Sequence, residues 1–205
     1  MAIDVSGFIG FSLASARNCT PIFKELAVLL RGDESVLEIG SGSGQHAVYF
    51  SEQLSGLTWL PSEIAQQLAV LQANLDSHGR ANIKAPLLLD LRDENWGTGL
   101  PGVDLIFSAN TLHIISWAEV VSLFCCLETV LKPGGRLILY GPFRYNDNFT
   151  SDSNAEFDCW LKARDPDSGI RDFEQVSSLA SEAGLTLECD ISMPANNQLL
   201  VWKQG

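Results

Sequence analysis

Hydrophobic residues follow two different patterns along the first two thirds of the chain. Short apolar runs alternate with longer segments in which apolar side chains repeat at helical spacing. Successive strand residues face opposite sides, whereas a helix returns to the same face every three or four residues. The short runs therefore predict buried strands, at 35–39, 57–60, 83–89, 103–109 and 136–140.

Turn and capping residues predict helices between these strands. Thr20-Pro21 is typical of a helix start, because threonine caps a helix and proline suits its first turn, and Gly32 can end that helix. Ser62 is expected to cap a helix that ends at Gly79. The full set of expected helices is 21–31, 45–54, 63–78, 117–131, about 154–163 and 173–183.

Alternating strands and helices favour a parallel sheet with helices on both faces. The last two apolar runs, 185–191 and 198–202, are separated by a short turn and predict an antiparallel pair. The predicted fold class is α/β, a doubly wound, mostly parallel seven-stranded sheet with a C-terminal antiparallel hairpin. We expect one domain over residues 1–205, with an N-terminal cap (1–32), a cofactor half (33–141) and a substrate half (142–205).

Composition limits the classes of partner. The chain has 13 Lys and Arg against 25 Asp and Glu, a net charge of −12, so we expect no nucleic acid or membrane partner. The five cysteines and three histidines lack zinc-ligand spacing, which predicts free thiols and no metal site. No apolar run is long enough to span a bilayer, and residues 5–16 lack the basic start of a signal peptide. The expected location is cytoplasmic, as a monomer or homodimer.

A glycine-rich loop follows the first predicted strand. Gly40-Ser41-Gly42-Ser43-Gly44 allows unusual backbone angles and lets a ligand contact bare backbone. Gln45 breaks both the G-x-G-x-x-G spacing of dinucleotide sites and the G-K-[ST] ending of phosphate loops. No basic residue lies in this stretch, so the predicted ligand carries no phosphate here.

Two acids follow the next two strands and extend this site. Glu63 can accept hydrogen bonds from two ribose hydroxyls, and Asp90 can accept one from an exocyclic amine. Together with the loop they favour S-adenosylmethionine, a cationic nucleoside without phosphates. The alternatives are a simple tight turn at the glycines, a helix-start acid at Glu63 and a turn residue at Asp90.

These features, with Lys132-Pro133-Gly134-Gly135, resemble the class I S-adenosylmethionine-dependent methyltransferases, and more narrowly the uncharacterised methyltransferase-like 26 family. The motifs that carry the narrower resemblance are Arg17-Asn18 with Pro21-Ile22, the stretch 38–47, Trp59-Leu60-Pro61-Ser62-Glu63, Tyr140-Gly141-Pro142-Phe143, Asn154 with Phe157-Asp158, and 193–197. Two departures are Ala16, where the family usually has an acid, and Glu63, where it often has Asp.

The resemblance implies a set of cofactor contacts. The methionine part would lie along Glu38, Gly40, Ser41, Gly42 and Gly44, with Asn110 near the methionine part or the transferred methyl group. Glu63 would hold the ribose, and Asp90 and Leu91 would meet the adenine. Ala16 puts a catalytic role for the missing acid in doubt.

Several loops are expected to supply the acceptor site. The catalytic candidates are His113, Asn110, Asn196, Asn197, Arg17 and Asn18. His113 could act as a base or be a structural, hydrogen-bonded histidine. Asn196-Asn197 could contact substrate or only form a turn.

The predicted function is methyl transfer from S-adenosylmethionine to a small polar molecule by in-line displacement. The alternatives are a non-catalytic binding or scaffold protein with this fold, and a protein methyltransferase. Asn110 is not followed by Pro-Pro and an aromatic residue, so the pattern associated with adenine-N6 methylation of nucleic acid is missing.

Overall fold

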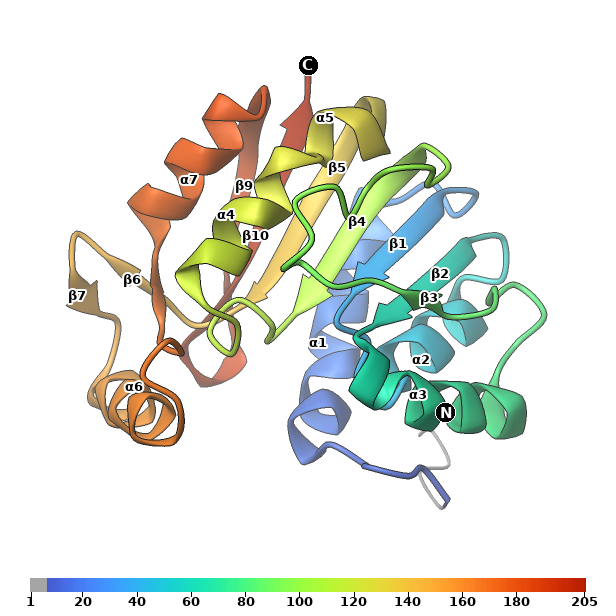
Figure 1. Ribbon diagram of the computed structural model, residues 1–205, viewed down its shortest axis with the longest axis horizontal. Coiled ribbons are helices and arrows are strands. Elements are labelled where there is room, and N and C mark those ends of the chain that lie inside the picture. Colours follow the sequence, from blue (N-terminus) through green and yellow to red (C-terminus); the bar gives the residue numbers. More distant parts are fainter. Residues whose placement is uncertain (1–6) are drawn as a thin grey trace. The chain divides into compact units, whose positions relative to one another are not determined.

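Strands and helices alternate along the chain, as the hydrophobic pattern predicts (Figure 1). The computed structural model describes residues 7–205, so the first six residues of the predicted N-terminal cap lie outside the described ones. The chain divides after Asp90 into two compact units. The described elements of the first unit are α1 (Leu13–Leu29), β1 (Ser35–Ile39), α2 (Gln45–Gln53), β2 (Thr58–Glu63), α3 (Ala65–His78) and β3 (Leu87–Leu88).

Parallel pairing in the first unit brings two loops to one edge of the sheet. Strand β1 pairs with β2 from Ser35 opposite Thr58 to Ile39 opposite Ser62, and β2 pairs with β3 at its end. Helices α2 and α3 pack on β2, and α1 packs on α2. The loop after Ile39 and the carboxylate of Glu63 therefore lie at neighbouring strand ends.

The second unit holds the remaining strands and the helices that cover them. In Figure 1, α4 and α7 lie side by side in this unit, and α7 packs on β9. The elements are β4 (Val103–Ala109), α4 (Trp117–Cys125), α5 (Leu127–Val130), β5 (Leu131–Gly141), β6 (Phe143–Tyr145), β7 (Asn148–Phe149), α6 (Asp152–Arg164), β8 (Arg171–Asp172), α7 (Phe173–Glu182), β9 (Leu185–Met193), η1 (Pro194–Asn196) and β10 (Asn197–Gln204).

One mixed sheet contains seven strands in the order β3-β2-β1-β4-β5-β10-β9. Strand β5 is parallel to β4, while β10 is antiparallel to both β5 and β9. The predicted α/β fold class, with its C-terminal antiparallel hairpin, is confirmed. A separate three-stranded sheet, β7-β6-β8, was not predicted, because its strands are only two or three residues long.

Helix α1 begins earlier than the predicted start at Thr20-Pro21. Ser12 is the N-cap, and its hydroxyl accepts a hydrogen bond from the Ser15 N–H at 3.2 Å, so Pro21 lies inside the helix. Proline removes an N–H donor, and its ring crowds the carbonyl group one turn earlier, so the packing of Ile22 and Leu26, both fully buried, must offset this cost. The sequence signal of proline at a first turn was therefore misleading.

Ser62 lies in β2 and is not the predicted helix cap. Its hydroxyl donates to the backbone oxygen of Glu38 at 2.6 Å, and α3 begins two residues after Glu63. The pairing of β2 with β1 thus extends the strand through Pro61, which needs no N–H where it lies. The predicted helix 117–131 is also divided, at Cys126, into α4 and α5.

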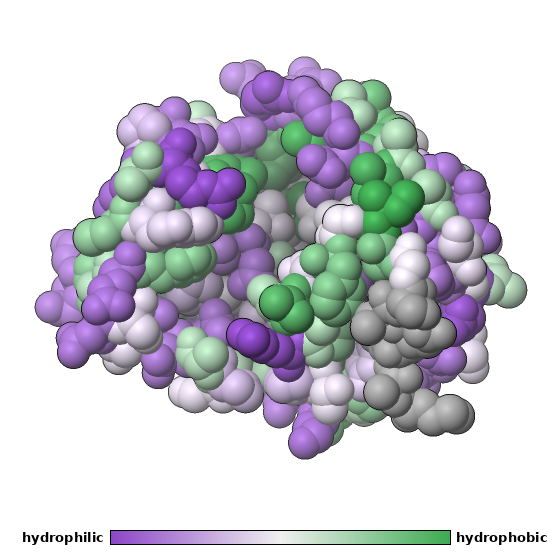
Figure 2. All heavy atoms as spheres, turned by 90° about the horizontal axis from the view of Figure 1, so that it is seen from below, coloured by the Kyte–Doolittle hydropathy of each residue, from purple (hydrophilic) through white to green (hydrophobic). Residues whose placement is uncertain are grey.

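The surface mixes polar and apolar residues. Figure 2 shows hydrophilic and hydrophobic residues interspersed on the face seen from below Figure 1. Within residues 7–205, no helix is both long and apolar enough to cross a membrane.

A capping box at the start of α4 provides a test of the fold. The Ser116 hydroxyl accepts from the Glu119 N–H, and the Glu119 carboxylate accepts from the Ser116 N–H at 2.7 Å. Ser116→Ala leaves that helix N–H without its acceptor and is expected to lower the free energy of unfolding by about 1 kcal/mol. Urea unfolding would measure this loss, and an unchanged midpoint would contradict it.

Candidate functional site

The glycine loop adopts the backbone conformation that its sequence predicts. Gly40, Gly42 and Gly44 have φ angles of 73°, 56° and 82°, in the left-handed region that residues with a side chain rarely adopt. The Ser41 N–H donates to the Ser62 oxygen at 2.9 Å, and the Ser41 hydroxyl accepts from the Ser62 N–H at 3.1 Å. The loop is therefore tied to the end of β2.

Two of these glycines have different surroundings. A Cβ atom on Gly44 would lie 2.9 Å from Leu71 Cδ1, so this glycine allows the start of α2 to pack closely on α3. A Cβ atom on Gly42 would meet nothing within 4 Å. Gly42 thus presents bare backbone to open space, as a loop that receives a ligand must.

Glu63 contacts the loop directly. The Gly42 N–H donates to Glu63 Oε1 at 3.2 Å, and the Ile64 N–H donates to Oε2 at 2.8 Å. The end of β3 is also close to Glu63, because the Leu89 N–H donates to the backbone oxygen of Glu63 at 3.0 Å. Asp90 is the next residue in the chain. The structure thus joins Glu63 to the glycine loop, and Leu91, 6% exposed, begins the second unit.

The Glu38 carboxylate is buried beneath this network of bonds, with 1% of the residue exposed. Its Oε2 accepts from Ser41 Oγ at 2.8 Å and from Trp59 Nε1 at 2.9 Å. Burial, together with the smaller effect of the negative charge of Glu63, raises the pKa of Glu38 to about 7, although both hydrogen bonds oppose the shift. Glu38 therefore stabilises the shape of the loop from inside the unit.

The imidazole of His46 lies next to Glu38. His46 Nδ1 is 3.8 Å from Glu38 Oε1, and His46 Nε2 is 2.7 Å from Asn18 Oδ1. Burial lowers the pKa of His46 to about 4, so the imidazole is neutral near pH 7.

The two candidate residues of α1, Arg17 and Asn18, differ in their exposure to solvent. Arg17 is exposed, whereas Asn18 is 7% exposed and bonded to His46. Asn18 is thus engaged within the first unit, which favours a positioning role for it over the predicted contact with substrate.

In the second unit, Asn110 and His113 come together at Gly141. A Cβ atom on Gly141 would lie 3.6 Å from His113 Nδ1 and 3.8 Å from Asn110 Oδ1. Asn110 has a left-handed φ of 59°, and its N–H donates to the Tyr140 oxygen at 2.8 Å. The loops after β4 and β5 therefore bring an amide and an imidazole close to the same glycine.

His113 is held in a turn between β4 and α4. The imidazole ring packs edge to face on the ring of Phe157, with 5.3 Å between the ring centroids. The backbone oxygen of His113 accepts a hydrogen bond from the Gly169 N–H at 3.0 Å. Burial, together with the smaller effect of the positive charge of Arg171, lowers the pKa of His113 to about 4. A neutral imidazole can accept a proton or hydrogen bond, but with this pKa it is a weak base.

The Asn196-Asn197 turn is stabilised by its own side chains. Asn197 Nδ2 donates to the Pro194 oxygen at 3.0 Å, and Ala195 and Asn196 both have left-handed φ angles. The Asn196 oxygen accepts from Asn154 Nδ2 at 3.0 Å, which joins the turn to α6. These contacts are those of a structural turn, and the predicted contact with substrate stays a prediction.

Two supporting residues of the loop were missed in the sequence. Trp59 and Ser62 bond to the side chain and backbone of Glu38, respectively. A signal did exist, because a glutamate within a buried strand needs donors, and a buried indole N–H needs an acceptor.

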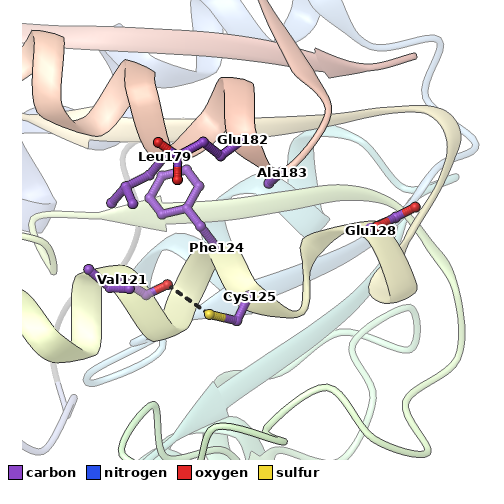
Figure 3. A pocket seen from close by; sticks show the side chains of 7 residues that line it. All are labelled: Val121, Phe124, Cys125, Glu128, Leu179, Glu182 and Ala183. Atoms are coloured by element: carbon purple, nitrogen blue, oxygen red, sulfur yellow. Dashed lines mark hydrogen bonds between the residues drawn. The ribbon is translucent and has the colours of Figure 1, made fainter.

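Figure 3 shows a groove of about 250 Å³ in the second unit, between α4–α5 and α7. None of the predicted site residues lines it. Its lining residues are Val121, Phe124, Cys125, Glu128, Leu179, Glu182 and Ala183.

Solved structures share this fold. An O-methyltransferase family protein from Burkholderia thailandensis matches with a TM-score of 0.79 and 16% identity, over 94% of this chain and 57% of that one. Human N-acetylserotonin methyltransferase, in complex with S-adenosylmethionine, matches with a TM-score of 0.78 and 15% identity, over 94% of this chain and 53% of that one. A methyltransferase of calicheamicin biosynthesis, with S-adenosylhomocysteine bound, matches with a TM-score of 0.71 and 17% identity, over 94% of this chain and 55% of that one.

These matches define the fold class as that of the class I methyltransferases, and the chain spans little more than half the length of each protein. Residues 10–204 match the family described as "Protein of unknown function (DUF938)", and the chain belongs to this family. The narrower resemblance to methyltransferase-like 26 stays a prediction.

The burial of Glu38 predicts a pH-dependent effect of Glu38→Gln. A raised pKa means that the stabilising contribution of Glu38 is fully present below its unfolded value of 4.5 and is lost as the pH rises toward 7. Glutamine does not ionise, so the variant does not lose stability in this way as the pH rises. Between about pH 4.5 and pH 7.5, the free energy of unfolding of the variant should therefore rise by about 3 kcal/mol relative to wild type. Urea unfolding at several pH values would measure this.

Glu34→Gln is a control for which we expect the opposite change of stability with pH, because the pKa of Glu34 is lowered. Burial raises the pKa of Glu34, but N–H donors of Arg31, Gly32 and Asp33 outweigh burial and lower it overall. The stability of this variant relative to wild type should therefore fall as the pH rises through the acid range. Parallel pH curves for Glu38→Gln and wild type would contradict the assignment of Glu38.

Proposed function

We propose that this protein binds S-adenosylmethionine at the glycine loop and transfers its methyl group to a small polar molecule. The observation that carries the proposal is the contact between the Glu63 carboxylate and the N–H of Gly42. It places an acceptor for sugar hydroxyls beside bare backbone that nothing else fills. The stretches 38–46 and 60–67 contain no Lys or Arg, which suits a cationic ligand without phosphates.

The residues present fit this cofactor. Gly40, Ser41, Gly42 and Gly44 would lie along its methionine part, and Glu63 would hold its ribose. Asp90 and Leu91 would meet the adenine. Glu38, because it is buried, would act by positioning the loop. When bound, S-adenosylmethionine supplies an electrophilic methyl group on a positively charged sulfur.

The acceptor side of the proposal rests on residues of the second unit. Asn110 Oδ1 and His113 Nδ1 both lie near Gly141, and each can accept a hydrogen bond from a hydroxyl or amine. With a pKa of about 4, His113 orients such a group better than it removes a strongly held proton. Arg17, Asn196 and Asn197 remain proposed acceptor contacts.

A small molecule is favoured over a protein as acceptor. One protein with this fold is named for N-acetylserotonin, a small molecule, and the loops here present amides and an imidazole. The balance of 13 basic against 25 acidic residues disfavours nucleic acid as substrate.

Cofactor binding can be tested at Gly42. Titration calorimetry with S-adenosylhomocysteine should show binding by wild type and none by Gly42→Val, because the added side chain occupies the open space beside Glu63. Glu63→Gln, which keeps the shape but halves the acceptor capacity, should weaken binding on the order of tenfold or more.

Gly32→Val is the matched control for this test. Gly32 also has a left-handed φ, and a Cβ atom there would also meet nothing within 4 Å. The variant thus carries a similar backbone penalty without obstructing the loop, and should bind as wild type does. Absence of binding by wild type, or undiminished binding by Gly42→Val, would refute the proposed function.

The class of acceptor can be tested with a labelled methyl group. Purified protein and S-[methyl-³H]adenosylmethionine are incubated with a cell extract separated into metabolite and protein fractions. We expect label in the metabolite fraction, reduced on the order of tenfold in Asn110→Ala. Label confined to proteins would instead identify a protein methyltransferase, and no transfer alongside cofactor binding would favour a scaffold.

A further inference from the structure

We propose that Asn18 and His46 are positioning residues for the glycine loop, which they support through the buried carboxyl group of Glu38. Helix α1 would thereby be part of the cofactor site, although it contributes no residue to the loop. This inference rests on the function proposed above and identifies what holds the binding loop in shape.

A continuous series of polar contacts runs from α1 to the loop. Asn18 lies 2.7 Å from His46 Nε2, His46 Nδ1 lies 3.8 Å from Glu38 Oε1, and Glu38 Oε2 accepts from Ser41 Oγ at 2.8 Å. All four residues are less than a tenth exposed. Because the contacts are dry, each must be matched donor to acceptor, or the unmatched group destabilises the fold.

The donor assignments favour one protonation state of Glu38. Asn18 Oδ1 is an acceptor, so His46 Nε2 carries the hydrogen, and the neutral imidazole then has a lone pair on Nδ1. That nitrogen lies 3.8 Å from Glu38 Oε1, which is too far for a hydrogen bond but close enough for electrostatic repulsion. An ionised carboxylate would repel the lone pair, so the buried pair favours a protonated, neutral Glu38.

The titratable groups around Glu38 favour the same state. They come from three elements: Cys19 on α1, His46 on α2 and Glu63 at the end of β2. Burial raises the pKa of the Cys19 thiol to about 12, so it stays neutral, and the charge of Glu63 opposes ionisation of Glu38. No positive charge among these groups offsets a second negative one.

A second contact joins α1 to the loop independently. The Ser12 N–H donates to Gln45 Oε1 at 2.6 Å, and Gln45 Nε2 donates to the Ser12 oxygen at 3.2 Å. Gln45 Oε1 also accepts from Ser43 Oγ at 2.9 Å, within the loop. The N-cap of α1 thus bonds to Gln45, and Gln45 bonds to Ser43 on the other side of Gly44, so the docking of α1 and the shape of the loop depend on each other.

The test compares variants of the network in S-adenosylhomocysteine binding and in amide hydrogen exchange of the ligand-free chain. Asn18→Leu and His46→Phe keep side-chain volume but remove the hydrogen bonds. We expect each to weaken binding about tenfold or more and to speed exchange of the Ser41 N–H to a similar degree. Tyr49→Phe is the matched control, because it removes a different bond between α1 and α2, the one between Thr20 and Tyr49 at 3.0 Å.

Glu38→Gln adds a second measurement, the pH dependence of affinity, which a purely structural role of these residues would leave unchanged. Its amide oxygen can accept from Ser41 and its side chain carries no charge, so it mimics the protonated acid at every pH. Wild-type affinity should fall several-fold from about pH 6.5 to pH 8.5, as the proton is lost. The affinity of Glu38→Gln should follow only the titration of the ligand itself. Circular dichroism would verify that each variant is folded.

The outcomes separate the two proposals. If wild type fails to bind S-adenosylhomocysteine, the proposed function fails, while exchange of the Ser41 N–H still tests the positioning role. Equal exchange in Asn18→Leu and Tyr49→Phe, or the same pH dependence of affinity in Glu38→Gln and wild type, would overturn the positioning role. Should Asn18→Leu and His46→Phe not fold, the pH comparison with Glu38→Gln decides the matter alone.

Discussion

One buried carboxylate connects the parts of the first unit that the candidate site requires. Glu38 is the residue before the last of β1, and its backbone oxygen accepts from Ser62 on β2. Its side chain accepts from Trp59 on β2 and from Ser41 in the glycine loop. A buried acid left without donors would cost several kcal/mol. The sequence around it is constrained accordingly, and the loop receives its shape from these bonds as well as from its glycines.

Local patterns predicted those elements whose conformation is determined locally. Strands β1 and β4 have the predicted bounds, because their apolar runs end at glycine or polar residues. The left-handed glycines of the loop follow from residue type alone. The start of α1 and the role of Ser62 were predicted wrongly, because both depend on distant partners. Pro21 is tolerated through packing, and Ser62 becomes a strand residue through its pairing beside Ile39.

The two groups of candidate residues were predictable to different degrees. For the proposed cofactor residues, spacing was enough to bring Glu63 to the glycine loop, since parallel strands end at one edge. For the proposed acceptor residues the relevant atoms belong to side chains whose amides can equally well bond within the protein. Asn197 holds its own turn, and Asn18 bonds to His46. Sequence identifies such residues but does not decide whether they turn outward or inward.

The hydrogen-bond network around Glu38 fixes the orientation of the glycine loop, which an apolar core would not do. Leucine and phenylalanine at positions 38 and 46 would fill the space, yet apolar contacts are non-directional and would allow the loop several arrangements. Hydrogen bonds from Ser41 and Trp59 fix the direction of the carboxyl group, and protonation of Glu38 avoids placing a net charge in the core. The burial that raises the pKa of Glu38 opposes its ionisation, and protonation also removes the repulsion between Glu38 and Glu63. Stability near neutral pH therefore depends on the protonation state of the same residue that bonds to the loop.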